Sequence, residues 1–316
     1  MRLYAVTGDA FARIEDGSAT IALADTGVQC LTRDPADDDV VYVGGRGSGV
    51  WKSEDGGASW RQLDFPHPDV FSLSVSAADG AVYAGTEPSM LFVSRDEGGT
   101  WTELSVLREI PSAPTWSFPP RPWTSHVRWI APSPHDADLV LAGIELGGVM
   151  RTEDGGQTWA DHRPGAQPDC HALAWHPREA GRAYEAGGGG AAWSFDGGDT
   201  WRPADEGRDR HYTWALAVDP ADPDCWYVSA STGPFAAHTE RPAEAYVYRW
   251  RGEGPWQPLE SGLPQPLDSM AYALAHREDK LLLALANGTL YESGDAGDSW
   301  RELAVENSPS RLLALA

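Results

Sequence analysis

Apolar and polar residues alternate along this chain in short segments, each bounded by residues that are typical of turns. One stretch contains four such segments in succession: Val70–Val75, Ala81–Gly85, Met90–Ser94 and Thr100–Leu104. β-Branched and aromatic residues dominate these segments, and such residues favour pleated strands. Four short antiparallel strands in a unit of roughly 40 residues are typical of one blade of a β-propeller.

A repeated octapeptide joins the last two strands of the unit. Its pattern, Ser/Thr-x-Asp-x-Gly-x-Ser/Thr-Trp, occurs five times, at 53–60, 94–101, 152–159, 194–201 and 293–300. Glycine supplies the positive φ angles of a tight turn, and the aspartate carboxylate accepts hydrogen bonds from turn amides. The terminal tryptophan is best explained by packing between neighbouring blades, where it buries ~200 Å².

The aspartates of this octapeptide are not expected to be catalytic. A catalytic carboxylate is needed once, or as one pair, whereas these recur in five equivalent places. We therefore predict a structural role for Asp55, Asp96, Asp154, Asp196 and Asp295.

The spacing of the tryptophans defines six complete units and two insertions, at about 105–125 and 231–245. The unit that ends at Trp256 has arginine where the other turns have aspartate. Four predicted strands remain outside these units: Leu3–Val6, Phe11–Ile14 and Ala19–Leu23 near the N-terminus, and Arg311–Leu315 at the C-terminus. Together they complete a seventh blade shared by both termini, which removes exposed sheet edges.

The sequence therefore predicts an all-β fold, with one seven-bladed β-propeller domain of four-stranded antiparallel blades over residues 1–316. In propellers of this type, ligands usually gather at one end of the central channel. The loops at that end join one blade to the next, or the second strand of a blade to its third. Both insertions fall in such loops, so we expect them on the face with the channel mouth.

The octapeptide resembles the Asp-box, or BNR repeat, of sialidases, of plant-cell-wall glycosidases such as xyloglucanases, of sortilin-type receptors and of a photosystem II assembly factor. The resemblance covers nearly the whole chain and implies a β-propeller of this superfamily. It does not imply one activity, because these families share the fold and not the chemistry. In them the Asp-box is structural and lies far from the active site.

Three members of this group fit the sequence poorly. Sialidases carry an Arg-Ile-Pro motif, and the nearest sequence here is Arg121-Pro122, so a typical sialidase is disfavoured. Xyloglucanases pair two propellers around a cleft, whereas this chain has repeats for one. The photosystem assembly factor is exported with a signal sequence, which the N-terminal segment 1–8 does not resemble.

Charge and cysteine content narrow the expected partners. A formal net charge of −23 repels phosphate backbones and anionic lipids, so we expect no nucleic-acid and no membrane partner. No apolar run approaches the ~18 residues of a membrane span. Cys30, Cys170 and Cys225 are odd in number and widely separated, which fits free thiols in a reducing compartment. We expect a soluble, cytoplasmic monomer that needs no cofactor.

The two insertions carry aromatic and charged residues outside the repeat pattern. The first contains Trp116, Phe118 and Trp123 beside Arg121, and its prolines lower the entropy cost of ordering it. The aromatic side chains suit stacking on a sugar or another flat ligand. The alternative is that the insertion is a lid that packs over the ring of blades. The second insertion contains Phe235, His238, Glu240 and Arg241.

Alignment of the innermost strands places one residue of each unit at an equivalent position near the channel: Gln29, Phe71, Arg128, His171, Trp214, Tyr272 and Arg311. His126 and Tyr212 lie two residues from this ring of positions. Arginine and histidine there would form an anion-binding patch inside an acidic protein. The predicted ligand-binding residues are Arg128, His171, His126, Tyr212, Trp214, Trp116, Trp123, Arg121, Tyr272 and Arg311.

Two kinds of chemistry remain open at the mouth. Glu145 and Glu185 come from adjacent units and would suit glycoside hydrolysis as a carboxylate pair, with His171 as a further catalytic candidate. His126, His171 and His211 lie on consecutive units, and three neutral imidazoles can bind zinc or iron, although we expect no metal. Structural hydrogen bonding is the alternative role for each of these residues.

We therefore expect a binding or scaffold propeller that holds a small molecule, a glycan or a peptide at its channel mouth. The alternatives are a glycoside hydrolase-like or lyase-like enzyme, and a protein-interaction platform that uses the blade edges. Two carboxylates ~5–10 Å apart above a concave pocket would favour the hydrolase. Arginine, histidine and aromatic residues that converge without such a pair would favour binding.

Overall fold

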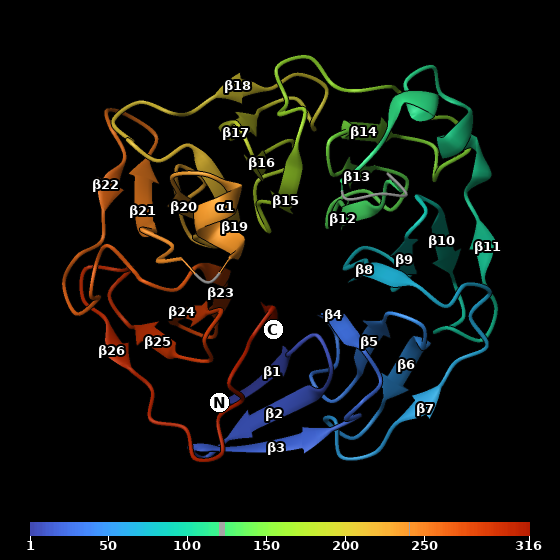
Figure 1. Cartoon of the computed structure of the whole chain (residues 1–316). Helices are drawn as coiled ribbons and strands as arrows, with labels where there is room; N and C mark the ends of the chain where they lie inside the picture. The colour runs from blue at the N-terminus through green and yellow to red at the C-terminus, as the bar shows by residue number, and fades with distance from the viewer. Residues whose placement is uncertain (120–123, 240) are drawn as a thin grey trace.

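The computed structural model describes residues 1–119, 124–239 and 241–316. In these residues seven antiparallel sheets stand around a central channel as the blades of a β-propeller (Figure 1). The predicted all-β fold with seven blades is confirmed. None of the helices in the described part of the chain combines the length and the apolar character that a membrane crossing needs.

Five blades of the described chain share one scheme, in which an innermost strand at the channel is followed outward by two strands and a two-residue rim strand. Their strands are β4 (Val28–Arg33), β5 (Val41–Gly45), β6 (Gly49–Ser53) and β7 (Arg61–Gln62); β8 (Val70–Val75), β9 (Val82–Thr86), β10 (Leu91–Ser94) and β11 (Thr102–Glu103); β15 (Cys170–Trp175), β16 (Ala183–Gly187), β17 (Gly190–Ser194) and β18 (Arg202–Pro203); β19 (Tyr212–Val218), β20 (Cys225–Ser231), β21 (Tyr246–Arg251) and β22 (Gln257–Pro258); and β23 (Ala271–Arg277), β24 (Lys280–Leu285), β25 (Leu290–Ser293) and β26 (Arg301–Glu302). The rim strands are short and exposed, which limits edge-to-edge pairing with other chains.

The other two blades depart from this scheme. One contains β12 (Val127–Pro132), β13 (Val140–Ile144) and β14 (Gly148–Thr152), and an isolated bridge between Arg151 and Ala160 replaces its rim strand. The last contains β1 (Arg2–Val6), β2 (Phe11–Glu15) and β3 (Ser18–Ala22), with β27 (Ala314–Leu315) as the strand at the channel. β27 is antiparallel to β1 and pairs Leu315 with Ala5.

The predicted C-terminal strand 311–315 is too long. Residues 311–313 are not in a strand, because the Leu312 amide bonds to the carbonyl of Ala286 and the Leu312 side chain is buried. Arg311 consequently lies before the strand and is exposed to solvent.

Short helices occupy the two insertions. The 3-10 helices η1 (Ser105–Glu109) and η2 (Ala113–Thr115) lie between β11 and β12, and the α-helix α1 (Pro234–His238) lies between β20 and β21. In Figure 1, α1 is in front of β19 and β20, close to the central channel.

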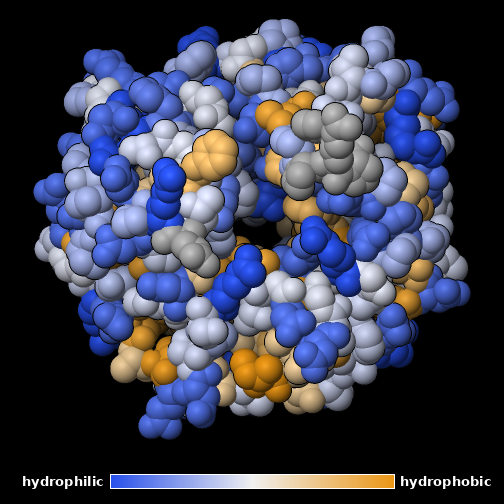
Figure 2. Space-filling model, viewed as in Figure 1, coloured by the Kyte–Doolittle hydropathy of each residue, from blue (hydrophilic) through white to orange (hydrophobic). Residues whose placement is uncertain are grey.

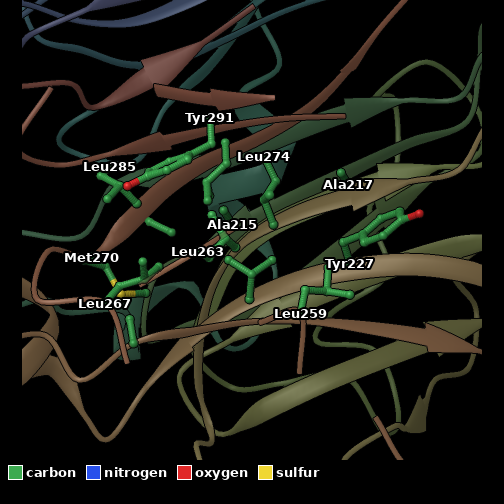
Figure 3. Packing of buried hydrophobic residues seen from close by; sticks show 14 of the residues in the cluster. Ala215, Ala217, Tyr227, Leu259, Leu263, Leu267, Met270, Leu274, Leu285 and Tyr291 are labelled. Atoms are coloured by element: carbon green, nitrogen blue, oxygen red, sulfur yellow. The ribbon is translucent and has the colours of Figure 1, made fainter. Parts of the chain in front are cut away.

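The tryptophans that end six of the units pack between their own blade and the preceding one. They are Trp60, Trp101, Trp159, Trp201, Trp256 and Trp300. Trp60 contacts Phe11 of the preceding blade edge to face, with ring centroids 4.7 Å apart. Figure 3 shows the cluster between the blade β19–β22 and the blade β23–β26. Tyr227 and Leu259 come from the first of these blades and Leu274 from the second. Burial between blades therefore explains these tryptophans.

The octapeptide turns are held by one repeated set of hydrogen bonds. In the turn 152–159, the Thr152 hydroxyl donates to Asp154 Oδ1 (2.8 Å) and accepts from the Gly156 amide (2.9 Å). The Thr158 amide and hydroxyl donate to the two oxygens of Asp154, at 2.8 and 2.6 Å. The same four bonds occur in the turns that contain Asp55, Asp96, Asp196 and Asp295. These bonds, led by that from the Thr158 hydroxyl, lower the pKa of Asp154 to about 2, so the carboxylate is ionised and fully engaged in the turn.

Substitution Thr152→Val is expected to destabilise the protein by about 1–3 kcal/mol, because it removes only the hydroxyl and leaves the buried amide of Gly156 without its acceptor. Urea unfolding followed by tryptophan fluorescence measures this loss. Thr20→Val, at an exposed position of β3, is the matched control. Equal free energies of unfolding for the two variants would contradict the structural role of the turn.

Candidate functional site

The central channel opens into a cavity of about 870 Å³. The innermost strand of each blade contributes to its wall, and the insertions contribute Phe118, Phe235 and His238. Figure 2 shows the opening at the centre of the molecule. Several of the predicted ligand-binding residues converge on this mouth.

A β-bulge interrupts the innermost strand of six blades near its start. The bulges coincide with six of the residues that alignment of the units places at equivalent positions: Gln29, Phe71, Arg128, His171, Trp214 and Tyr272. A bulged residue has no direct cross-strand partner, so its side chain is free to point away from the regular faces of the sheet. The bulges thereby bring unlike side chains from six blades to one site.

Arg128 lies flat in the wall of this cavity. Its guanidinium carbon is 4.5 Å from the ring centroid of Trp214 and 5.8 Å from that of Phe71. The Arg128 side chain is 18% exposed, and its Nε lies 3.7 Å from Glu145 Oε2. Within residues 1–119, 124–239 and 241–316, Arg128 makes no hydrogen bond, and Glu145 is its ion-pair partner. Its terminal amino groups are thus available to a ligand.

His126 connects two carboxylates beside Arg128. Its Nε2 is 2.6 Å from Glu145 Oε2, its Nδ1 is 3.5 Å from Glu87 Oε2, and its ring stacks on Phe71. Burial lowers the pKa of His126, but the contacts with Glu145 and Glu87 outweigh burial and raise it above its ordinary value. Burial likewise opposes ionisation of Glu145, yet the bond from His126 and the charge of Arg128 hold its pKa at about 2.

His171 lies behind the cavity wall and is fully buried. Its Nδ1 is 2.6 Å from the carbonyl oxygen of Thr213, which fixes Nδ1 as a donor. Its Nε2 is 3.4 Å from Asp169 Oδ2 and has no hydrogen-bond partner among the described residues. One oxygen each of Glu145 and Asp169 and a nitrogen of His171 lie within 4.8 Å of one another.

His238 anchors α1 over the other side of the mouth. Its Nε2 is 2.9 Å from the Tyr212 hydroxyl, and its Nδ1 is 2.8 Å from the Tyr272 hydroxyl. Burial lowers the pKa of His238 to about 4, so the ring is neutral near pH 7. The same burial raises the pKa of Tyr272, which keeps that hydroxyl protonated.

The structure brings together five of the predicted binding residues in the cavity wall: Arg128, His126, Tyr212, Trp214 and Tyr272. Other predicted residues lie elsewhere. Trp116 is buried in the core between two blades, where its Nε1 donates to Ser112 Oγ (3.1 Å), and Arg311 is exposed and does not line the cavity. Arg121 and Trp123 lie outside the described residues.

The predicted pair of Glu145 and Glu185 does not form in the mouth. The strand pairing makes Gly188, not Glu185, the equivalent of Glu145, because Ile144 and Gly187 are the corresponding last residues of β13 and β16. Glu185 lies in the middle of β16, is fully buried, and accepts a hydrogen bond from the Gln167 amide. Burial raises its pKa well above the ordinary value, so it is a neutral acid away from the cavity.

The predicted histidine cluster is also absent from the described residues. His211 is exposed and does not line the cavity, so it does not join His126 and His171. The cluster that does form uses Asp169, which the sequence analysis missed. Little in the sequence marks Asp169 as a site residue, because an aspartate in a loop is ordinarily a turn residue. Asp69 has the same place in another unit, two residues before Phe71, as Asp169 has before His171. Glu87, which follows β9 as Glu145 follows β13, was missed for the same reason.

Comparison with known proteins supports the fold. No family model matches the chain, and no curated protein sequence matches it. The solved GH74 enzyme of Niastella koreensis is 16% identical with a TM-score of 0.72, over 96% of this chain and 52% of that chain. An ancestral GH74 enzyme is 19% identical with a TM-score of 0.67, over 84% of this chain and 36% of that one.

A third structure, YCF48 bound to D1 peptide, is 19% identical with a TM-score of 0.58, and the match covers 87% of this chain and 81% of that chain. At these identities the likeness concerns the fold alone. The chain spans about half or less of the length of the two GH74 enzymes. The neighbours place the chain among β-propellers without assigning an activity.

His126 is expected to stabilise the fold below its unfolded pKa of about 6.5, and this contribution is lost as the pH rises through the raised folded pKa. The measurement is the difference in free energy of unfolding between the wild type and His126→Gln, from urea titrations at about pH 6 and about pH 9. The difference should be larger at the lower pH. A difference that grows with pH would show that His126 is neutral in the folded protein.

Proposed function

We propose that this propeller binds a small molecule, a glycan or a peptide at its channel mouth, with an acidic group of the ligand on Arg128. The observation that carries the proposal is the guanidinium of Arg128. It stacks against Trp214 inside a cavity and has no hydrogen-bond acceptor among the described residues.

A guanidinium in such a place favours a planar acceptor. It presents several N–H donors in a fixed plane, which matches the two oxygens of a carboxylate or those of a phosphate. Leaving these donors unpaired beside an apolar wall is unfavourable, and a bound anion removes that penalty. Because Trp214 and Phe71 hold the group flat, little side-chain entropy is lost when the ligand binds.

The remaining wall favours a ligand with a flat or ring-shaped part next to its acidic group. Trp214, Tyr272 and Phe71 line the cavity with aromatic surface, and such rings stack on sugars, aromatic rings and peptide planes. Among proteins of similar fold are GH74 enzymes and a peptide-bound YCF48. Sugar acids and acidic peptides are therefore the first ligands to test.

A glycoside hydrolase-like or lyase-like activity is the second candidate. It is favoured by Glu145 and Asp169, two carboxylates with oxygens within 4.8 Å of each other beside the cavity. A glycosidase needs one carboxyl group that keeps its proton near neutral pH. The pKa of Glu145, held at about 2, leaves that residue ionised, so in such an enzyme it would serve as the nucleophile or base and not as the acid.

Arg128→Gln is expected to weaken binding of an acidic ligand roughly tenfold to a hundredfold, since hydrogen bonds to charged groups contribute about 1.5–3 kcal/mol. Ligands are found by thermal shift in a panel of sugar acids, their neutral parent sugars and short acidic peptides. Affinities for wild type and variant are then measured by calorimetry.

Arg182→Gln is the matched control. Arg182 also stacks on aromatic rings, Trp193 and Phe195, but it lies outside the cavity and is paired with Asp224. Unchanged binding in Arg128→Gln, or an equal loss of affinity in both variants, would contradict the assignment of Arg128 to the binding site. Release of product from aryl glycosides that stops in Glu145→Gln would establish the hydrolase instead.

A further inference from the structure

We propose that Glu145, Asp169 and His171 bind one divalent transition-metal cation, of which Zn²⁺ is the strongest candidate, at the wall of the channel mouth. This goes beyond the proposed function, because the metal is bound by these three side chains whether or not an organic ligand is present. It also differs from the histidine-only site that the sequence suggested.

The three residues meet from two adjacent blades. Glu145 directly follows β13, Asp169 directly precedes β15, and His171 is the second residue of β15. One ligand atom of each residue lies within 4.8 Å of the other two. Zn²⁺ binds carboxylate oxygen and imidazole nitrogen at about 2.0–2.2 Å. His171 Nε2 and Asp169 Oδ2 are 3.4 Å apart, so a small rotation of the Glu145 side chain would complete one coordination sphere.

His171 is arranged as a metal ligand would be. Because Nδ1 donates to the carbonyl of Thr213, the neutral ring carries its lone pair on Nε2. That nitrogen is 3.4 Å from a carboxylate oxygen of Asp169, and either a proton on Nε2 or a metal cation would remove the repulsion between these two acceptors. The ring has no other place to turn, since it is fully buried against Tyr212 and Trp214.

The Asp169 carboxylate is also held in place. Its Oδ1 accepts a hydrogen bond from the Leu146 amide (3.2 Å), which leaves Oδ2 toward His171. Gly188 lies so close that a Cβ at this position would be 2.1 Å from Asp169 Oδ2. Any larger residue at position 188 would therefore displace the carboxylate.

Charge and donor type select the kind of cation. As metal ligands, two carboxylates and one imidazole nitrogen carry two negative charges, which a divalent cation balances. Mixed nitrogen and oxygen donors suit zinc and its neighbours, whereas Ca²⁺ and Mg²⁺ prefer oxygen alone. Three protein ligands leave a fourth position of a tetrahedral zinc open, and both carboxylates line the cavity from which a ligand would reach it.

The experiment uses the full chain after treatment with a chelator. Calorimetric titration with Zn²⁺, Mn²⁺ and Ca²⁺ is expected to give one saturable site, with Zn²⁺ tighter than Mn²⁺ and no comparable site for Ca²⁺. Asp169→Asn and Glu145→Gln should each weaken Zn²⁺ binding at least about tenfold. Co²⁺ bound to the wild type should give visible absorption bands that are lost in both variants.

Asp69→Asn is the matched control, because Asp69 occupies the equivalent loop and its Oδ1 accepts the Gly47 amide (2.9 Å), but Phe71 stands where the other blade has His171. Its affinity for Zn²⁺ should equal that of the wild type. Absence of saturable Zn²⁺ binding in the wild type would overturn the proposal. Equal weakening of Zn²⁺ binding in Asp69→Asn and Asp169→Asn would also overturn it, because it would show that Zn²⁺ binds to acidic surface residues in general.

Discussion

Burial of both faces of every blade is the constraint on which this structure depends. The second strand of most blades is buried along its whole length, so its side chains must be covered from two sides. Only the neighbouring blades can supply this cover, and the tryptophan at the end of each octapeptide fills the gap to the preceding blade. The octapeptide turn therefore stabilises the fold by positioning its tryptophan. Its hydrogen bonds direct the chain so that the tryptophan reaches the interface.

Because the blades pack so closely, the innermost strands are where different side chains can occupy equivalent positions of different blades. Regular strand positions face a neighbouring blade, but the bulged residue of each innermost strand is released from the pairing of the sheet. The fold thus offers one adjustable position in each of six blades. Arginine, histidine, tryptophan and tyrosine occupy four of these positions in consecutive blades. A site with several kinds of side chain arises from one repeated backbone feature.

The parts of this structure that repeat could be predicted from the sequence. The octapeptides and tryptophans established the blades, and alignment of the units brought Arg128, Trp214 and Tyr272 to one position. The failures concern features that do not repeat. Trp116 was predicted to bind ligand, but a buried apolar surface was available between two blades and the ring packs there. Glu185 was predicted to pair with Glu145 because the two residues come from adjacent units, but it lies in the middle of β16 and is buried there.

Asp169 shows why a site residue can be missed when its sequence is read alone. His171 lies two residues away in the same blade, but Glu145 is distant in sequence and comes from the preceding blade, so the cluster forms only where the two blades meet. The equivalent Asp69 has the same local backbone role without a histidine beside it. Local sequence therefore identifies both residues as turn aspartates, and only the three-dimensional arrangement distinguishes them.

Glu145 couples the two halves of the mouth. It accepts a hydrogen bond from His126, lies 3.7 Å from Arg128, and contributes an oxygen to the cluster with His171. A cation bound to Glu145 would draw its negative charge away from Arg128 and add positive charge to the cavity. Both effects favour an acidic ligand on the guanidinium, and linkage requires that the ligand favour the cation equally. The two proposed binding events should therefore strengthen each other, and Glu145 is the residue through which they act.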